Sequence, residues 1–347
     1  MAARTADFSS ALYLGLRHPA AALGEWNALT LGKPAALREP PGELALAREL
    51  ALLQGCAAAV VLPSTLHLYW DLFGMLARDP VVLLIDGAAY PIARWGAQRA
   101  ALLGVPVCRF RHGDAMQARS LARHWLQSGR RPLILADGYC PGSECLPPLA
   151  AYAEIAQSGA GCLVLDDTQV LGVLGPDGGG SVPLHGLGGA PVLAGASLAK
   201  GFGAPLAVLS GSAALLERFD AHSQTRRHCS PASAAAIAAA LRALRLNRGY
   251  GGQLRRELGQ RVRQFRNALR RAGIACRGGM FPVQAVPLLP STDGPRLHAA
   301  LRRGGVEAVL QSSGRHMALA FLLRADHAPD DVMLATAALE HLWKEFA

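Results

Sequence analysis

Short apolar runs alternate with longer amphipathic stretches over the first two thirds of the chain. The apolar runs are rich in Val, Leu and Ile and lie at residues 57–62, 81–85, 106–110, 132–136, 162–165, 191–195 and 205–209. Helical patterns separate the early runs, at residues 65–77, 90–103, 114–128 and 147–158. Strands that are apolar throughout are typical of a parallel sheet with both faces covered. The pattern therefore predicts an α/β fold, a mostly parallel sheet flanked by helices, with ligands bound at the carboxyl ends of its strands.

The pattern changes after about residue 230, where helices begin to dominate. An Ala-rich helix at 231–246 and a basic amphipathic helix at 253–272 are followed by predicted strands at 281–289, 306–310 and 317–322 and helices at 294–303 and 330–345. This mixture predicts a smaller α+β domain. We therefore expect an N-terminal segment (1–40), a large α/β domain (41–229) and a smaller C-terminal α+β domain (230–347).

Composition excludes several classes of protein. No apolar run reaches the roughly 20 residues of a membrane span, and the first residues lack the order of a signal peptide, so we expect a cytoplasmic protein. The seven cysteines are dispersed without a C-x-x-C pair, which argues against a disulfide framework and against a structural zinc site. The net charge of +10 is spread along amphipathic helices without a nucleic-acid motif. We interpret the basic residues as solvent-exposed helix faces. The alternative is that they bind an anionic substrate such as a coenzyme A thioester.

One lysine stands out because the chain almost always uses arginine. Lys33, Lys200 and Lys344 are its three lysines, and Lys200 lies in an apolar, glycine-rich segment directly after the predicted strand 191–195. Arginine cannot form an imine, whereas a desolvated lysine can lose its proton and attack a carbonyl. Ser197 and the glycines after Lys200 suit a phosphate contact. The segment predicts a lysine that holds a cofactor, with a surface turn as the plain alternative.

A carboxylate pair follows the predicted strand 162–165. Asp166 and Asp167 lie at the carboxyl end of this apolar run. A buried carboxylate is costly unless a cation accompanies it. The protonated ring nitrogen of pyridoxal phosphate (PLP) would be such a cation. A helix N-cap or a metal site remains the alternative for this motif alone.

These motifs together resemble a known family. Asp166 to Gln169, Gly172 to Gly180 and Ser197 to Gly203 resemble the central block of the α-oxoamine synthases, a family of fold-type-I PLP enzymes. Further similar segments are Ser10 to Leu16, Asp137 to Leu149 and Phe281 to Gln284. The resemblance implies an aspartate-aminotransferase-like fold, PLP as cofactor, and a homodimer with shared active sites.

The resemblance also assigns roles to single residues. Lys200 matches the lysine that forms the imine with PLP, Asp166 the carboxylate on the ring nitrogen, and Ser197 a phosphate ligand. The remaining cofactor-binding positions are Tyr90, where the family stacks a histidine on the ring, Ser64, Thr65 and Leu66 at a helix N-terminus for the phosphate, Asp137 at the start of a family loop, and Gln169.

Two departures leave the reaction open. Gln169 stands where the family has a histidine, and an amide cannot exchange a proton near neutral pH. Ala320 stands where the family has the arginine for the substrate carboxylate, and Arg315 or Arg324 are the candidate replacements.

The resemblance implies a decarboxylating acyl transfer from a CoA or carrier-protein thioester to an amino acid. Other PLP chemistry at Cα remains open, namely transamination, racemisation, lyase chemistry or decarboxylation. A degenerate thioester-binding protein is the third possibility.

Overall fold

The structure is a computed structural model that describes residues 5–141, 146–313 and 316–346. The chain divides into two compact units. The larger unit comprises Arg17–Cys140 and Leu146–Gly249, and the smaller unit takes in the N-terminal residues to Leu16 and the chain from Tyr250. The chain passes from one unit to the other inside a long helix, whereas the sequence pattern places a domain boundary before this helix.

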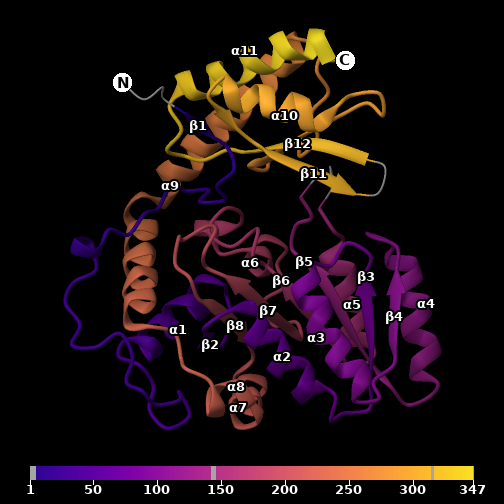
Figure 1. Ribbon diagram of the computed structural model, residues 1–347. Helices are drawn as coiled ribbons and strands as arrows, with labels where there is room; N and C mark the ends of the chain where they lie inside the picture. Colours follow the sequence, from indigo (N-terminus) through magenta and orange to yellow (C-terminus); the bar gives the residue numbers. More distant parts are fainter. Residues whose placement is uncertain (1–4, 142–145, 314–315, 347) are drawn as a thin grey trace. The chain divides into compact units, whose positions relative to one another are not determined.

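A seven-stranded sheet forms the centre of the larger unit (Figure 1). Its strand order is β2 (Ala58–Leu62), β8 (Ala207–Gly211), β7 (Val192–Ser197), β6 (Cys162–Asp166), β5 (Arg131–Asp137), β3 (Val81–Asp86) and β4 (Val107–Phe110). The strands from β7 to β4 are parallel, and β8 runs antiparallel to both of its neighbours. β2 consequently points the same way as β7, so every strand of this sheet except β8 ends at the same edge. The predicted, mostly parallel sheet is confirmed.

Helices cover both faces of this sheet. The α-helices described in this unit before residue 230 are α1 (Glu43–Leu53), α2 (Thr65–Leu76), α3 (Pro91–Leu102), α4 (Ala115–Leu126), α5 (Leu149–Ser158), α6 (Ser181–Leu184), α7 (Ala213–His222) and α8 (Gln224–His228). Successive residues of a strand point to opposite faces. Leu83 accordingly packs in a core cluster with α2 and α3, whereas Leu84 packs in a second cluster with α4 and α5. Burial on both faces explains why the strands are apolar throughout.

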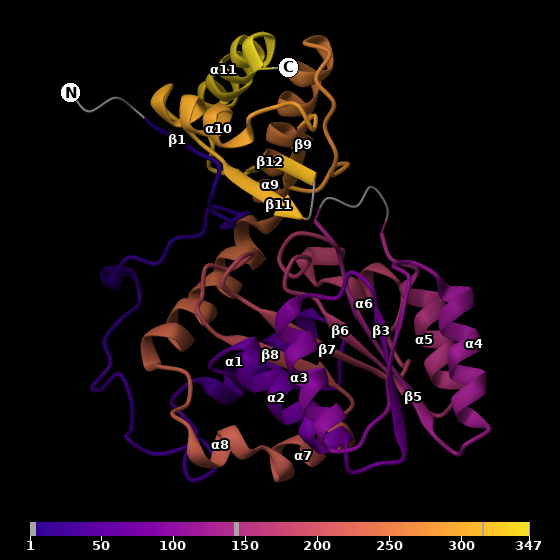
Figure 2. The ribbon, with the colours of Figure 1, turned by 45° about the vertical axis from the view of Figure 1, so that its right-hand side comes forward.

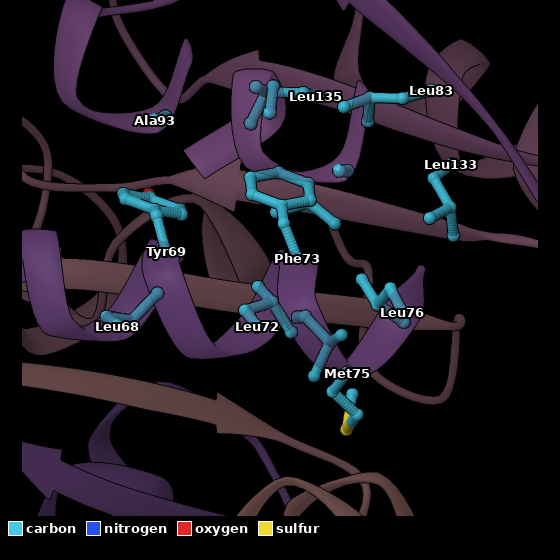
Figure 3. Close-up of a cluster of buried hydrophobic side chains, with 14 of the residues drawn as sticks. Leu68, Tyr69, Leu72, Phe73, Met75, Leu76, Leu83, Ala93, Leu133 and Leu135 are labelled. Atoms are coloured by element: carbon cyan, nitrogen blue, oxygen red, sulfur yellow. The ribbon is translucent and has the colours of Figure 1, made fainter. Parts of the chain in front are cut away.

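Helix α2 shows how the local sequence places one wall of the site. Ser64 caps it, because the Ser64 Oγ accepts a hydrogen bond from the His67 N–H at 3.4 Å. Leu68, Tyr69, Leu72 and Phe73 are fully buried, and Figure 3 shows them on the side of α2 that packs against the sheet. Burying each of these side chains stabilises the fold by roughly 1.5–3 kcal/mol. The cap and the apolar face together fix where α2 begins and how it lies on the sheet.

The described residues of the smaller unit form two short sheets and three helical segments. Its three-stranded antiparallel sheet has the order β11 (Val309–Ser313), β12 (His316–Leu322) and β9 (Val283–Pro287), and β1 (Ala6–Asp7) pairs in parallel with β10 (Val306–Glu307). The helices are α10 (Gly294–Arg303), α11 (Pro329–Phe346) and the later part of α9 (Ala234–Arg271), which Figure 2 shows from a second side. The described chain contains no helix long and apolar enough to cross a membrane.

The prediction of two separate helices at 231–246 and 253–272 is wrong. The structure has one helix of 38 residues, which continues through Gly249, Gly251 and Gly252. A glycine inside a helix costs only about 1 kcal/mol relative to alanine. Apolar residues buried before and after the glycines outweigh that cost, so the helix does not end there.

Candidate active site

The predicted site residues gather at the carboxyl edge of the large sheet. Asp137, Asp166 and Ser197 are the last residues of the neighbouring strands β5, β6 and β7. Asp137 and Asp166 are partners in the parallel register, so their Cα atoms lie opposite each other. Lys200 follows in the turn directly after β7. Strand ends alone therefore bring these four residues of the larger unit to one place.

Asp166 is a buried carboxyl group with several donors around it. The Thr168 N–H donates to its Oδ1 at 3.0 Å, and the side chain is 5% exposed. Burial raises the pKa of Asp166, while the hydrogen bonds from Thr168, the nearby Tyr69 hydroxyl and the positive charge of Lys200 act in the opposite direction. The effect of burial on the pKa is the largest, so the groups around Asp166 do not fully compensate the negative charge of its carboxylate.

Thr168 is a site residue that the sequence reasoning did not assign. Its hydroxyl accepts a hydrogen bond from the Ser197 N–H at 3.0 Å, while its own N–H serves Asp166. The Ser197 Oγ in turn accepts from the Ala199 N–H at 3.3 Å, which leaves the Ser197 O–H able to donate to a ligand. The sequence feature that could have identified Thr168 is its hydroxyl, which lies two residues after the strand-end carboxylate of Asp166.

Lys200 is partly buried beside the two carboxyl groups. Burial lowers the pKa of Lys200, and the charges of Asp166 and Asp137 oppose that shift. The turn is tightly packed, because a side chain at Gly201 would collide with the Leu171 carbonyl oxygen. A lysine with a lowered pKa is deprotonated more often than an exposed one, and its neutral amine is the nucleophilic form.

Asp137 is held from the neighbouring helix. Its Oδ1 accepts a hydrogen bond from the Tyr90 N–H at 3.1 Å, at the N-cap position of α3. Burial, followed by the nearby charge of Asp166, raises the pKa of Asp137. The Tyr90 side chain itself is 53% exposed. The structure thus joins Tyr90 to the site through its backbone.

Tyr69 is the second residue that the sequence reasoning missed. Its ring is fully buried on α2 (Figure 3), and the described residues give its hydroxyl no hydrogen-bond partner of ordinary geometry. Burial and then the Asp166 carboxylate raise the pKa of this phenol well above its usual range. In the sequence Tyr69 matches the apolar face of a helix, so nothing distinguishes it from a core aromatic.

The N-terminus of α2 lies at the same edge of the sheet as these residues. Leu68 and Tyr69 pack directly against Gly195, near the end of β7. Ser64, Thr65 and Leu66 form the start of this helix, and the Ser64 Oγ also contacts the His67 Nδ1 at 2.8 Å. Free N–H groups at a helix N-terminus attract anions, which is the property expected for a phosphate site.

Asp167 has a structural position behind the site. It is fully buried, its Oδ2 accepts from the Ser181 N–H at 2.7 Å and its Oδ1 from the Ser181 hydroxyl. Burial raises its pKa to about 6 despite these donors. Any side chain at Gly138 or Gly180 would collide with this carboxylate. Asp167 therefore fastens the glycine-rich loop 172–180 to the end of β6.

The other predicted residues are not all brought to this edge. Gln169 lies partly buried in the turn after β6, and Arg315 lies outside the described residues. Ala320 is buried in β12, where it pairs with Ala285. The expected arginine position is thus a small apolar residue inside the sheet of the smaller unit.

Arg324, the other predicted carboxylate ligand, is buried in the smaller unit. Its Nε donates to Asp326 Oδ1 at 2.9 Å and its Nη1 to the Asp7 carbonyl oxygen at 2.7 Å. These contacts explain its burial without a substrate, since they tie the N-terminal residues to the end of β12.

Known sequences similar to this chain include members of the family that its motifs resemble. Residues 146–314 match the family described as aminotransferase class I and II. The chain is 31% identical over 277 residues to 8-amino-7-oxononanoate synthase of Halorhodospira halophila (77% of this chain, 65% of the relative). It is 32% identical over 244 residues to the same-named protein of Alcanivorax borkumensis (69% of this chain, 62% of the relative). These matches span just under two thirds of the length of those relatives.

Solved structures share the fold at low sequence identity. Serine palmitoyltransferase of Sphingomonas wittichii has a TM-score of 0.88 at 17% identity, with 98% of this chain and 88% of that chain covered. The 8-amino-7-oxononanoate synthase of Francisella tularensis has a TM-score of 0.78 at 17% identity, with 98% of both chains covered. A structure of SPT with PLP has a TM-score of 0.88 at 16% identity, with 98% and 88% covered. The chain is therefore similar in sequence to proteins named 8-amino-7-oxononanoate synthase, and it shares the fold of these solved structures.

Proposed function

We propose that this protein is a PLP-dependent transferase whose Lys200 holds the cofactor covalently. The observation that carries the proposal is the partly buried Lys200 amine beside two carboxyl groups at the carboxyl edge of a parallel sheet. Burial favours its neutral, nucleophilic form. The PLP bound by SPT, which has the same fold, supports the proposal.

The residues present fit this cofactor in three respects. Lys200 supplies positive charge to the buried carboxyl group of Asp166 and to the partly buried one of Asp137, so a protonated ring nitrogen would make up the deficit at Asp166. The Ser197 hydroxyl and the N-terminus of α2 offer donors for a phosphate. The buried Tyr69 hydroxyl beside Asp166 still lacks a partner of ordinary geometry.

PLP supplies a sink for the electrons of a bond broken at Cα of an amino substrate. Within the site, Asp166 would hold the proton on the ring nitrogen, and Ser197 with the start of α2 would bind the phosphate. The Lys200 amine would move the proton at Cα as general base. Tyr90 would lie against the ring, and the Gln169 amide would donate a hydrogen bond without exchanging a proton.

The reaction we propose is the decarboxylating transfer of an acyl group from a CoA or carrier-protein thioester to an amino acid. The names of the 8-amino-7-oxononanoate synthase relatives support it. Another reaction at Cα, above all transamination, is the second candidate. Ala320 in place of the carboxylate arginine and Gln169 in place of a histidine favour that candidate. We further propose that the protein acts as a cytoplasmic homodimer.

Thiol release separates these reactions. Purified protein loaded with PLP is incubated with panels of amino acids and acyl-CoA thioesters, and free thiol is measured with a chromogenic reagent. Acyl transfer predicts thiol release that requires both substrates and is absent in Lys200→Arg. Conversion of PLP to its amine form without thiol release would establish transamination instead. Solvent deuterium that enters Cα without a new product would indicate racemisation.

A further inference from the structure

The Asp137–Asp166 pair is unequal in its surroundings. Both carboxyl groups end adjacent parallel strands and are partners in register. Within the described residues, Lys200 is the cation that acts on both of them. Two neighbouring carboxylates with one partly buried ammonium are costly, so one carboxyl group is expected to keep a proton.

The hydrogen-bond donors decide which group that is. Asp166 receives the Thr168 N–H at 3.0 Å and lies beside the hydroxyls of Thr168 and Tyr69, all of which favour its charged form. Among the described residues, the Tyr90 N–H at 3.1 Å is the donor to Asp137, which also faces the carboxylate of Asp86 at the end of β3. Donors stabilise an anion and a nearby anion destabilises it, so the proton belongs on Asp137.

We propose that Asp137 carries the proton of this pair and is the hydrogen-bond donor of the site, while Asp166 remains the anion. Among the described residues the Tyr90 N–H bonds to the Asp137 Oδ1 and no donor bonds to its Oδ2, so we place the proton on Oδ2, from which it would be donated to an oxygen of the bound ligand. The proposal rests on the proposed function for the identity of that ligand. It gives the site the exchangeable proton that Gln169 cannot supply.

Several titratable groups act on Asp137. They are Asp166 on β6, Asp86 on β3, Lys200 after β7, the Tyr69 phenol on α2 and the Cys140 thiol on the loop after β5. Burial and the two carboxylates raise the pKa of Asp137, and the Tyr90 N–H and Lys200 lower it. The effects that raise the pKa of Asp137 outweigh those that lower it. Asp137 therefore keeps its proton at neutral pH and loses it at higher pH.

Infrared spectroscopy of the full-length protein in D2O tests the proposal directly. A protonated carboxylic acid has a carbonyl stretch that a carboxylate lacks. At pH 7 the wild type should show this band, and Asp137→Asn should lose it. Asp167→Asn and the exposed-site variant Asp293→Asn are the matched controls and should keep it. Circular dichroism checks that each variant is folded.

Variants of the donors test why the proton resides on Asp137. Tyr69→Phe and Thr168→Val remove donors from Asp166, so the proton should become shared and the band should shift. Asp166→Asn removes the like charge, so the Asp137 band should titrate away at lower pH than in the wild type. A wild-type spectrum without the band at pH 7, or a band that survives in Asp137→Asn, would overturn the proposal.

PLP uptake is measured separately from its visible absorbance. A band assigned to Asp137 in a protein that does not take up PLP would refute the proposed function and leave the proton assignment standing. PLP uptake by a protein without the band would refute the proton assignment and leave the proposed function standing.

Discussion

The Thr168 hydroxyl accepts a hydrogen bond from the backbone N–H of Ser197 at 3.0 Å. The Thr168 N–H meanwhile donates to Asp166, so one residue connects the end of β6 to the start of the turn that carries Lys200. This link connects the strand-end residues Asp166 and Ser197, for both of which we propose a role in cofactor binding.

Loss of the Thr168 hydroxyl should loosen the site without unfolding the protein. Thr168→Val keeps the shape of the side chain but leaves the Ser197 N–H without its acceptor, at a cost of about 1–3 kcal/mol. We expect PLP affinity to fall by roughly 10-fold or more in an absorbance titration, since 1.4 kcal/mol is a factor of 10. Thr168→Ser should restore it. Equal affinity in all three proteins would refute the link.

Neutralising Asp166 should separate cofactor binding from activity. Asp166→Asn retains the size of the side chain but no longer favours a protonated ring nitrogen. PLP should still attach to Lys200, while the rate of Cα deuterium exchange falls by roughly 100-fold or more. Exchange at the wild-type rate would show that Asp166 does not serve the ring nitrogen.

Close packing under the Lys200 turn predicts a stability effect at Gly201. A methyl group at this position would collide with the Leu171 carbonyl oxygen, so Gly201→Ala should lower the free energy of unfolding by about 1–3 kcal/mol. Gly188→Ala is the matched control, because nothing lies within 4 Å of the new methyl group. Urea unfolding measures both. A Gly201→Ala variant as stable as the control would contradict the packing.

Asp167 should make stability depend on pH. Its pKa is raised by burial from 3.8 to about 6, so the folded protein binds this proton more tightly than the unfolded chain does. Stability from this group is fully present below the unfolded pKa and is lost as the pH rises through the folded one. Between pH 4 and pH 6.5 the wild type should lose about 2–3 kcal/mol that Asp167→Asn does not lose. Urea unfolding at both pH values measures this loss. An equal change in the free energy of unfolding of the wild type and of Asp167→Asn would contradict the assignment.

The sequence predicts the sheet and the strand-end residues because both follow from local pattern. Continuously apolar runs identify a sheet buried on both faces, and Asp166, Ser197 and Asp137 stand directly at the ends of such runs. Tyr69 could not be predicted, because a helix period places it in the core and only the tertiary fold brings it to Asp166. The single helix α9 was missed because glycines are weak helix breakers when packing continues on both sides.

Arg324 shows a different limit of sequence reasoning. Its nearness in sequence to Ala320, where the resemblance places an arginine, made it a candidate for a substrate carboxylate. Its partners Asp7 and Asp326 come from the two ends of the chain, and the ion pair with Asp7 is visible only in the folded smaller unit.

The attachment of PLP to Lys200 is the central claim, and reduction followed by peptide mapping tests it most directly. The protein is loaded with PLP, reduced with borohydride, digested and examined by mass spectrometry. We expect loss of the visible absorbance band and a phosphopyridoxyl mass on the peptide that contains Lys200, with none in Lys200→Arg. A label on Lys33 or Lys344 instead, or a protein that takes up no PLP, would contradict it.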